Sequence, residues 1–182
     1  GKVLDDDYSD GLTNKLHAMV KRLGEPVIRR AVKRAMKELG RQFVLGETIQ
    51  DALKNGEKKN DAGYTFSYDM LGEAALTKSD ANKFYESYRS AIKMLAKNSK
   101  SDSVKKNPGI SIKLSALHPR YERSKLDLLR KELLPKLFEL INLAKNMKVD
   151  ICFDAEEADR LNLSLFLVDD ILQSDVIDNE YS

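Results

Sequence analysis

From residue 43 onward, short apolar runs typical of strands alternate with longer stretches typical of helices. Strands that alternate with helices form a parallel sheet with right-handed crossover connections. No Gly-rich phosphate-binding loop follows any of these strands, which disfavours a nucleotide-binding doubly wound sheet. We therefore predict an α/β fold of the (β/α)8 TIM-barrel type. The expected strands are 43–45, 64–68, 110–115 and 149–153, and the expected helices are 47–53, 79–98, 125–147 and 157–172.

In the first forty residues, the spacing of apolar residues is typical of helices and not of strands. Apolar residues recur at helical spacing within residues 12–23 and again within 27–39. Gly24 and Gly40 are expected to end these two helices. We predict two domains: a helical arm over residues 1–40 and the N-terminal half of a barrel over residues 41–182.

Two segments are predicted to interrupt the regular elements. Residues 55–63 are rich in Asn, Gly and Lys, which is typical of a loop. Pro135 falls inside the expected helix 125–147, where a proline costs about 3 kcal/mol because it lacks a backbone N–H. A kink or break is therefore expected near Pro135.

The number of strands predicts an incomplete barrel. A closed barrel has eight strands and typically ~250 residues. This chain has 182 residues and four strand candidates. We expect about four βα units cut from a longer polypeptide, with open sheet edges that favour self-association.

Composition bears on several classes of protein, although it neither requires nor excludes phosphate-rich partners. The formal net charge of +2 is far from the strongly basic balance of a dedicated nucleic-acid binder. The single cysteine, Cys152, precludes an internal disulfide and fits a reducing cytosol. The histidines and the cysteine are too far apart in sequence to suggest a metal site, and none is predicted. No apolar run approaches the ~20 residues that span a bilayer.

A lysine lies on the polar side of the third expected strand. Ile110 and Ile112 share one face of that strand, whereas Ser111, Lys113 and Ser115 share the other. A lysine on a face that a parallel sheet normally buries requires a partner. Lys113 could bind a carboxylate, form a Schiff base, or pair with a barrel acid.

Acidic residues follow two other expected strands. Asp69 and Asp154 come at strand ends, where barrel enzymes place their chemistry, and either could neutralise Lys113. Asp154 could instead cap the next helix, and Glu156 could favour its dipole. Asp69 and Glu73 are four residues apart and share a face if a helix begins near Asp69.

Several stretches of the amino-acid sequence resemble one protein family. The stretches are 23–30, 40–49, 64–75, 109–121 and 154–161. They resemble the flavin-dependent proline dehydrogenase module of the bacterial bifunctional proline-utilisation family, from about residue 12 to the last helix. The resemblance is closer to the bifunctional than to the single-function members, because stretch 40–49 and the helices before it belong to the former.

This resemblance implies a fold and an activity. It implies a distorted (β/α)8 barrel that holds FAD and oxidises L-proline to Δ1-pyrroline-5-carboxylate by hydride transfer to the flavin N5. It further implies that electrons pass to a membrane quinone, in a cytoplasmic protein peripheral to the inner membrane.

The resemblance also implies roles for particular residues. Lys113 matches a lysine that helps bind the substrate carboxylate, and Asp154 matches a catalytic, cofactor-contacting acid. Ala155 is expected beside the flavin. Asp69 and Glu73 are expected to hold substrate-binding cations or to line the pocket.

Parts of the family pattern are expected to lie outside this chain. These are an arginine pair that clamps the substrate carboxylate, most flavin contacts, the DNA-binding module and the aldehyde dehydrogenase module. We therefore expect the isolated chain to bind FAD weakly and to be inactive. Two alternatives stay open: an unrelated barrel lyase or aldolase using Lys113 as a Schiff base, and a non-catalytic interaction region.

Overall fold

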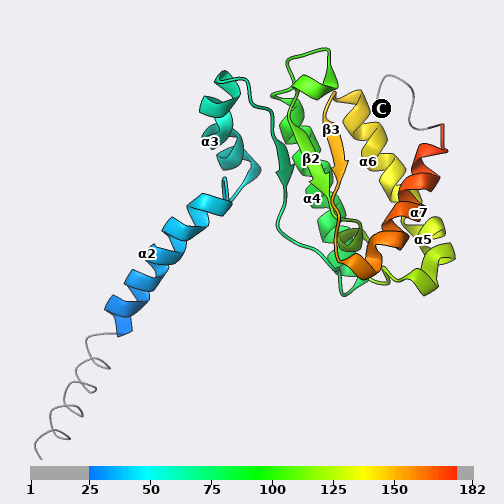
Figure 1. Ribbon diagram of the computed structural model, residues 1–182, viewed down its shortest axis with the longest axis horizontal. Coiled ribbons are helices and arrows are strands. Elements are labelled where there is room, and N and C mark those ends of the chain that lie inside the picture. The colour runs from blue at the N-terminus through cyan, green and yellow to red at the C-terminus, as the bar shows by residue number, and fades with distance from the viewer. Residues whose placement is uncertain (1–24, 176–182) are drawn as a thin grey trace, which may run out of the picture. The chain divides into compact units, whose positions relative to one another are not determined.

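The computed structural model describes residues 25–175 and divides the chain into two compact units (Figure 1). The first unit is Gly1–Glu47 and the second is Thr48–Ser182. The helix expected at 12–23 lies outside the described residues.

Helix α2 (Glu25–Phe43) is the regular element described in the first unit. The expected end at Gly40 is wrong, because the amide of Val44 still donates to the Gly40 carbonyl at 2.6 Å. The expected strand 43–45 is also wrong, since Phe43 is the last residue of α2. One interior glycine costs a helix only about 1 kcal/mol, whereas a strand needs a neighbour to pair its backbone groups.

The second unit contains a parallel sheet, as the sequence predicts. Its strands are β1 (Ser67–Asp69), β2 (Gly109–Ile112) and β3 (Asp150–Phe153), in the order β1-β2-β3. Asp69, Ser111 and Cys152 stand side by side in register, as do Tyr68, Ile110 and Ile151 in the neighbouring row. The second row faces the core, which leaves the first row on the polar face.

Helix α3 (Ile49–Asp61) is longer than predicted, and most of the expected loop 55–63 is helical. Thr48 caps the helix by accepting a hydrogen bond from the Asp51 amide at 3.1 Å. Gly56 fits within the helix because the chain approaches Tyr68 closely there. A Cβ at this position would lie 3.1 Å from the Tyr68 hydroxyl oxygen.

The predicted break at Pro135 is confirmed. Helix α5 (Leu126–Glu132) ends before the proline and α6 (Leu134–Asn146) begins just ahead of it. Pro135 thus lies in the first turn of α6, where its missing N–H removes no helical hydrogen bond.

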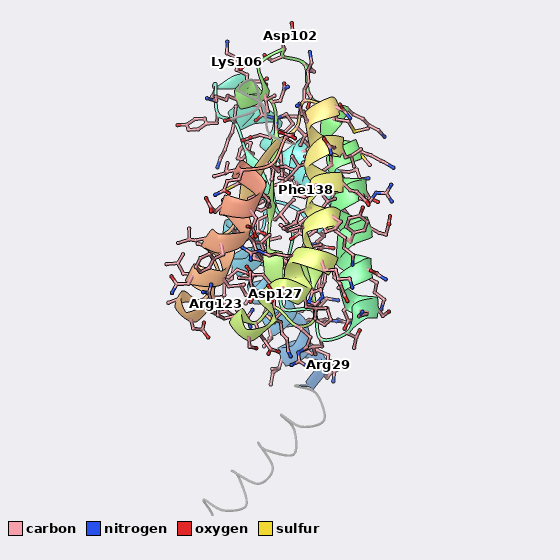
Figure 2. All side chains as sticks on the ribbon, turned by 90° about the vertical axis from the view of Figure 1, so that its right-hand side faces the viewer. Arg29, Asp102, Lys106, Arg123, Asp127 and Phe138 are labelled. Atoms are coloured by element: carbon pink, nitrogen blue, oxygen red, sulfur yellow. The ribbon has the colours of Figure 1, made fainter. Side chains whose placement is uncertain are left out.

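Helices α4 (Lys78–Ala96) and α6 lie side by side against the apolar face of the sheet (Figures 1 and 2). Helix α7 (Leu161–Leu172) follows β3. The side chains between these layers are fully buried. They include Tyr88, Ile92, Leu95, Ile110, Ile112, Leu137 and Leu140.

The repeated order of strand and helix, with parallel pairing, is that of a partial α/β barrel. A short 3-10 turn, Leu114–Leu117, follows β2, and Lys113 stands between strand and turn. Within residues 25–175, no helix is both long and apolar enough to cross a membrane.

Candidate functional site

The carboxyl ends of all three strands meet at one edge of the sheet, because the strands are parallel. Asp69 is the last residue of β1, Lys113 directly follows β2, and Asp154 directly follows β3. Three charged side chains from distant parts of the sequence are thereby brought together.

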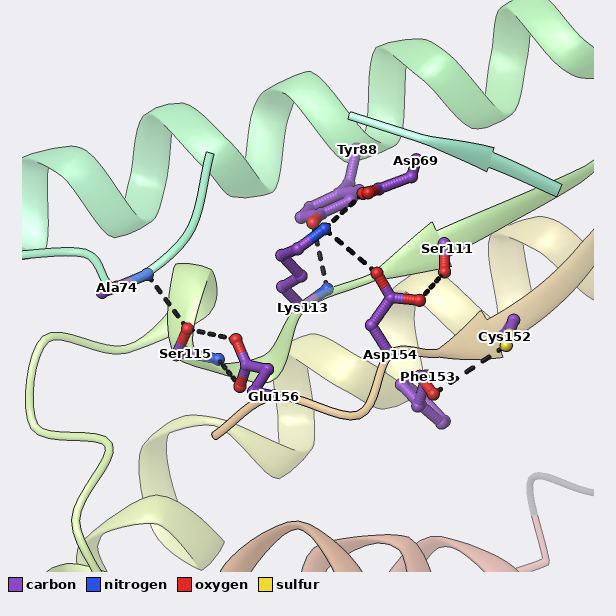
Figure 3. A network of polar contacts seen from close by, with 10 residues as sticks. All are labelled: Asp69, Ala74, Tyr88, Ser111, Lys113, Ser115, Cys152, Phe153, Asp154 and Glu156. Atoms are coloured by element: carbon purple, nitrogen blue, oxygen red, sulfur yellow. Dashed lines mark hydrogen bonds and ion pairs between the residues drawn. The ribbon is translucent and has the colours of Figure 1, made fainter. Parts of the chain in front are cut away.

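Lys113 pairs with both acids (Figure 3). Its Nζ donates to Asp69 Oδ1 at 2.5 Å and to Asp154 Oδ2 at 3.0 Å. The lysine side chain is 14% exposed, against 26% for Asp154 and 48% for Asp69. The requirement for a partner that the sequence imposes on Lys113 is therefore met twice.

The surrounding residues hold this arrangement in place. Ser111, which is buried, donates its hydroxyl to Asp154 Oδ1, so both oxygens of that carboxylate are engaged. The backbone amide of Asp154 donates to the Ile112 carbonyl at 3.0 Å. The Lys113 amide donates to the Tyr88 hydroxyl oxygen at 3.1 Å. We call Asp69, Ser111, Lys113 and Asp154 the Lys113 cluster.

The electrostatics of the cluster keep Lys113 charged. Partial burial works against the ammonium, but the hydrogen bonds and negative charges of Asp69 and Asp154 outweigh it and raise the pKa of Lys113 above its usual range. A Schiff base requires the neutral amine as nucleophile. The geometry therefore disfavours the lyase or aldolase alternative.

The cluster has spare binding capacity. An ammonium has three N–H donors, and the two acids accept two of them. The remaining donor suits a ligand carboxylate, while the partly exposed Asp69 suits a ligand cation. A zwitterion such as an amino acid offers both groups.

Two helix-based interpretations of the acids are wrong. Asp154 caps no helix, since α7 begins several residues later, after the short turn Ala158–Arg160. Asp69 and Glu73 do not share a helical face, because α4 begins only at Lys78, with Thr77 and Asp80 forming its capping box. Glu73 lies exposed in the loop between β1 and α4, outside the Lys113 cluster.

The sequence reasoning missed a second set of contacts beside the first. The Ser115 hydroxyl donates to Glu156 Oε1, and the Ser115 amide donates to Glu156 Oε2 at 3.2 Å. The same hydroxyl accepts the Ala74 amide at 3.0 Å. We call Ala74, Ser115 and Glu156 the Ser115 cluster. Its signal in the sequence is the spacing, since Ser115 and Glu156 follow Lys113 and Asp154 by two residues each.

His118 makes structural contacts. It is buried, its Nδ1 accepts the Arg120 amide at 3.1 Å, and its Nε2 lies 3.3 Å from a Glu132 carboxylate oxygen. Lys78 also donates to Glu132, at 3.1 Å. These bonds hold the loop that contains His118.

Ala155 is exposed and directly follows Asp154. Among residues 25–175, no group of three or more His, Cys, Asp or Glu side chains is arranged to hold a metal ion.

Comparison with known proteins identifies the family. A family model described as "Proline dehydrogenase" matches residues 52–181. The chain belongs to the proline dehydrogenase family. This finding confirms the resemblance and places the Lys113 and Ser115 clusters within the matched region.

The relatives include bifunctional proteins. The chain is 47% identical to "Bifunctional protein PutA" of Klebsiella aerogenes over 169 residues, which are 93% of this chain and 13% of that protein. It is 30% identical to "Proline dehydrogenase 1" of Bacillus subtilis (strain 168) over 117 residues, 64% of this chain and 34% of that protein. This family member is thus more similar to the bifunctional relative, as expected, and spans a small part of its length.

A solved structure supports the fold. A variant of proline utilization A (PutA) from Bradyrhizobium japonicum superposes with a TM-score of 0.69 at 42% identity, covering 89% of this chain and 16% of that one. A second family model, described as "DNA-binding domain of Proline dehydrogenase", matches residues 1–43. This second match differs from the expectation that any DNA-binding module lies outside the chain.

Proposed function

We propose that this chain supplies part of the substrate site of a flavin-dependent proline dehydrogenase that oxidises L-proline to Δ1-pyrroline-5-carboxylate. The observation that carries the proposal is the Lys113 cluster, a charged lysine with a spare donor at the carboxyl edge of a parallel sheet. The family match and the similarity to PutA support the substrate.

In this proposal each cluster residue has one task. Lys113 donates its third N–H to the carboxylate of proline. Asp154, whose oxygens are held by Ser111 and Lys113, stands as the catalytic acid group beside the ring nitrogen. Asp69 and Glu73 have one of two roles: they hold the cations that complete substrate binding, or they line the substrate pocket.

FAD is the cofactor that the family implies. When bound, it supplies the acceptor for the hydride that leaves the ring carbon next to nitrogen. Asp154 and Ala155 are the residues of this chain proposed to contact it, because the family resemblance implies both and Ala155 is an exposed neighbour of the Lys113 cluster. The chain's own contribution is to bind and orient proline and to keep Lys113 protonated.

Further parts of the proposal rest on the family. Electrons are proposed to pass to a membrane quinone, in a cytoplasmic protein bound peripherally to the inner membrane. Residues 1–40 are proposed as a helical arm and 41–182 as the first part of the barrel, which the division after Glu47 supports. Self-association is proposed because β1 and β3 each have one edge without a strand in the described sheet.

The test is a titration of the purified chain with FAD, followed by anaerobic addition of L-proline. Binding of FAD with proline-dependent bleaching of the flavin absorbance supports a working site within this chain. Activity that appears only when the remaining residues of the domain are added supports a site shared with them. Absence of flavin reduction by proline in both preparations rejects the proposal.

We propose DNA contact as a second function, confined to residues 1–43. The description of the matched family model supports it, and α2 carries cations that suit phosphate groups. These are Arg29, Arg30, Lys33, Arg34 and Lys37. A mobility-shift assay with duplex DNA should show binding that weakens steeply as salt rises. Absence of a mobility shift at low salt would reject DNA contact by residues 1–43.

A further inference from the structure

We infer that Ser115 is a positioning residue that holds the loop between β1 and α4, which carries Glu73, against the turn that follows β2. The inference rests on the proposed function for the role of Glu73. The contact itself rests only on the geometry of the Ser115 cluster.

Ser115 joins three segments that carry site residues (Figure 3). It lies two residues after Lys113 and is 1% exposed. Its hydroxyl accepts the Ala74 amide at 3.0 Å, and its carbonyl accepts the Ala75 amide at 3.0 Å. It also donates its hydroxyl and its amide to Glu156, two residues after Asp154.

The loop that Ser115 holds has an unfavourable backbone. Ala74 adopts a positive φ of 50°, which costs a residue with a Cβ about 1 kcal/mol or more. Such a conformation persists only when its surroundings hold it. The bond from the Ala74 amide to the Ser115 hydroxyl is a side-chain contact that does so.

Few side chains could replace Ser115. The hydroxyl must accept from an amide and donate to a carboxylate at the same time, and only serine or threonine offers both in so small a volume. Glu156 holds Ser115 in place, because its two carboxylate oxygens accept from the hydroxyl and from the amide of Ser115. The loop after β1 and the segment after β3 are therefore tied to one residue in the 3-10 turn that follows β2.

The test compares Ser115→Ala with Ser115→Thr, which keeps the hydroxyl, and with Ser99→Ala as the matched control. The Ser99 hydroxyl is buried and has no hydrogen-bond partner within the described residues, so its loss removes no bond. Amide hydrogen exchange is measured on the whole chain at Ala74 and, as a check of the core, at Ile112. The same variants are titrated with L-proline.

In Ser115→Ala, exchange at Ala74 should accelerate about tenfold because one hydrogen bond is lost, while exchange at Ile112 stays unchanged. Affinity for L-proline should fall about threefold to tenfold, since Glu73 on the released loop is no longer held in the orientation that binding requires. Ser115→Thr should restore both properties, and Ser99→Ala should alter neither.

Three results overturn the inference. The first is unchanged exchange at Ala74, and the second is an equal acceleration at Ala74 and Ile112, which would indicate a loss of global stability. The third is faster exchange at Ala74 with unchanged proline affinity, which denies the positioning role. If the unmodified chain binds no proline by itself, the titration is repeated with the remaining residues of the domain added. Absence of binding there as well rejects the proposed function, and the exchange data then decide by themselves whether Ser115 holds the loop.

Discussion

The Lys113 and Ser115 clusters are built from the same parts and differ in what they leave unsatisfied. In each, a buried serine near the end of β2 donates to an acid that follows β3: Ser111 to Asp154, and Ser115 to Glu156. The first cluster adds a lysine and a second acid. The second adds only backbone amides.

The difference teaches which polar group at a strand end can bind a ligand. In the Ser115 cluster, each donor of the serine has an acceptor within the chain, and the hydroxyl also accepts a bond. In the Lys113 cluster one ammonium donor is left over, and Asp69 is about half exposed. The closed cluster suits a structural role, whereas the open one suits binding.

The largest effect is expected when the open cluster loses its cation. Lys113→Met should weaken binding of L-proline about 10- to 100-fold, because a hydrogen bond to a charged group is worth about 1.5–3 kcal/mol. Lys105→Met, at an exposed lysine outside both clusters, is the matched control. Equal affinities of the two variants, measured by calorimetry, would remove Lys113 from the site.

The closed cluster should respond in stability instead. Glu156→Ala should lower the free energy of unfolding by about 1–3 kcal/mol, because it leaves both hydrogen-bond donors of Ser115, its hydroxyl and its amide, without an acceptor at a buried position. The neighbouring Glu157→Ala removes only an exposed ion pair with Arg160 and should cost less than about 1 kcal/mol. Urea unfolding measures both, and similar losses would contradict the comparison.

The pH dependence of stability should also report on the ion pairs of the Lys113 cluster. The folded state raises the pKa of Lys113 above 10.5, so the stability from its ion pairs is fully present below that pH and lost as pH rises through the folded pKa. The difference in unfolding free energy between the unmodified chain and Lys113→Met should therefore stay constant through neutral pH and decrease in strong alkali. A change near neutral pH would show that another group titrates with the pair.

The smallest effect is expected at Tyr121, which lies near Glu156 and shares a hydrogen bond of 2.8 Å with Ser164. Burial raises its pKa to about 12, so its contribution to stability is present below pH 10.0 and is lost above it. Tyr121→Phe should cost about 1 kcal/mol at neutral pH and should reduce the alkaline loss. In a pH titration of Tyr121→Phe, the part of the tyrosinate absorbance that appears at the highest pH should be smaller than in the unmodified chain.

Local sequence patterns predicted much of the second unit. The alternation of strands and helices predicted the parallel sheet, and Pro135 marked the break between α5 and α6. The pattern around Lys113 required a partner and named both acids that supply one. These features follow from periodicity, backbone chemistry and the cost of burying a charge, all of which act locally.

Other features depended on contacts that no local pattern contains. Gly56 lies within helix α3, and a Cβ there would come within 3.1 Å of the hydroxyl oxygen of Tyr68, which lies twelve residues further along. The bonds of Ser115 to Ala74 and Glu156 each join segments 41 residues apart. Their partners could be named only once the carboxyl ends of the three strands were seen at one edge.

A comparison of helices α2 and α6 shows what local sequence patterns leave undecided. Each has an apolar stripe at helical spacing, yet Val32 and Met36 of α2 are at least 50% exposed, whereas Leu137 and Leu140 of α6 are fully buried. The sequence by itself determined that both segments are helices, because periodicity and propensity act within a few turns. Only the tertiary structure decided which stripe is covered and which polar strand ends meet, because burial and pairing depend on neighbours brought from far along the chain.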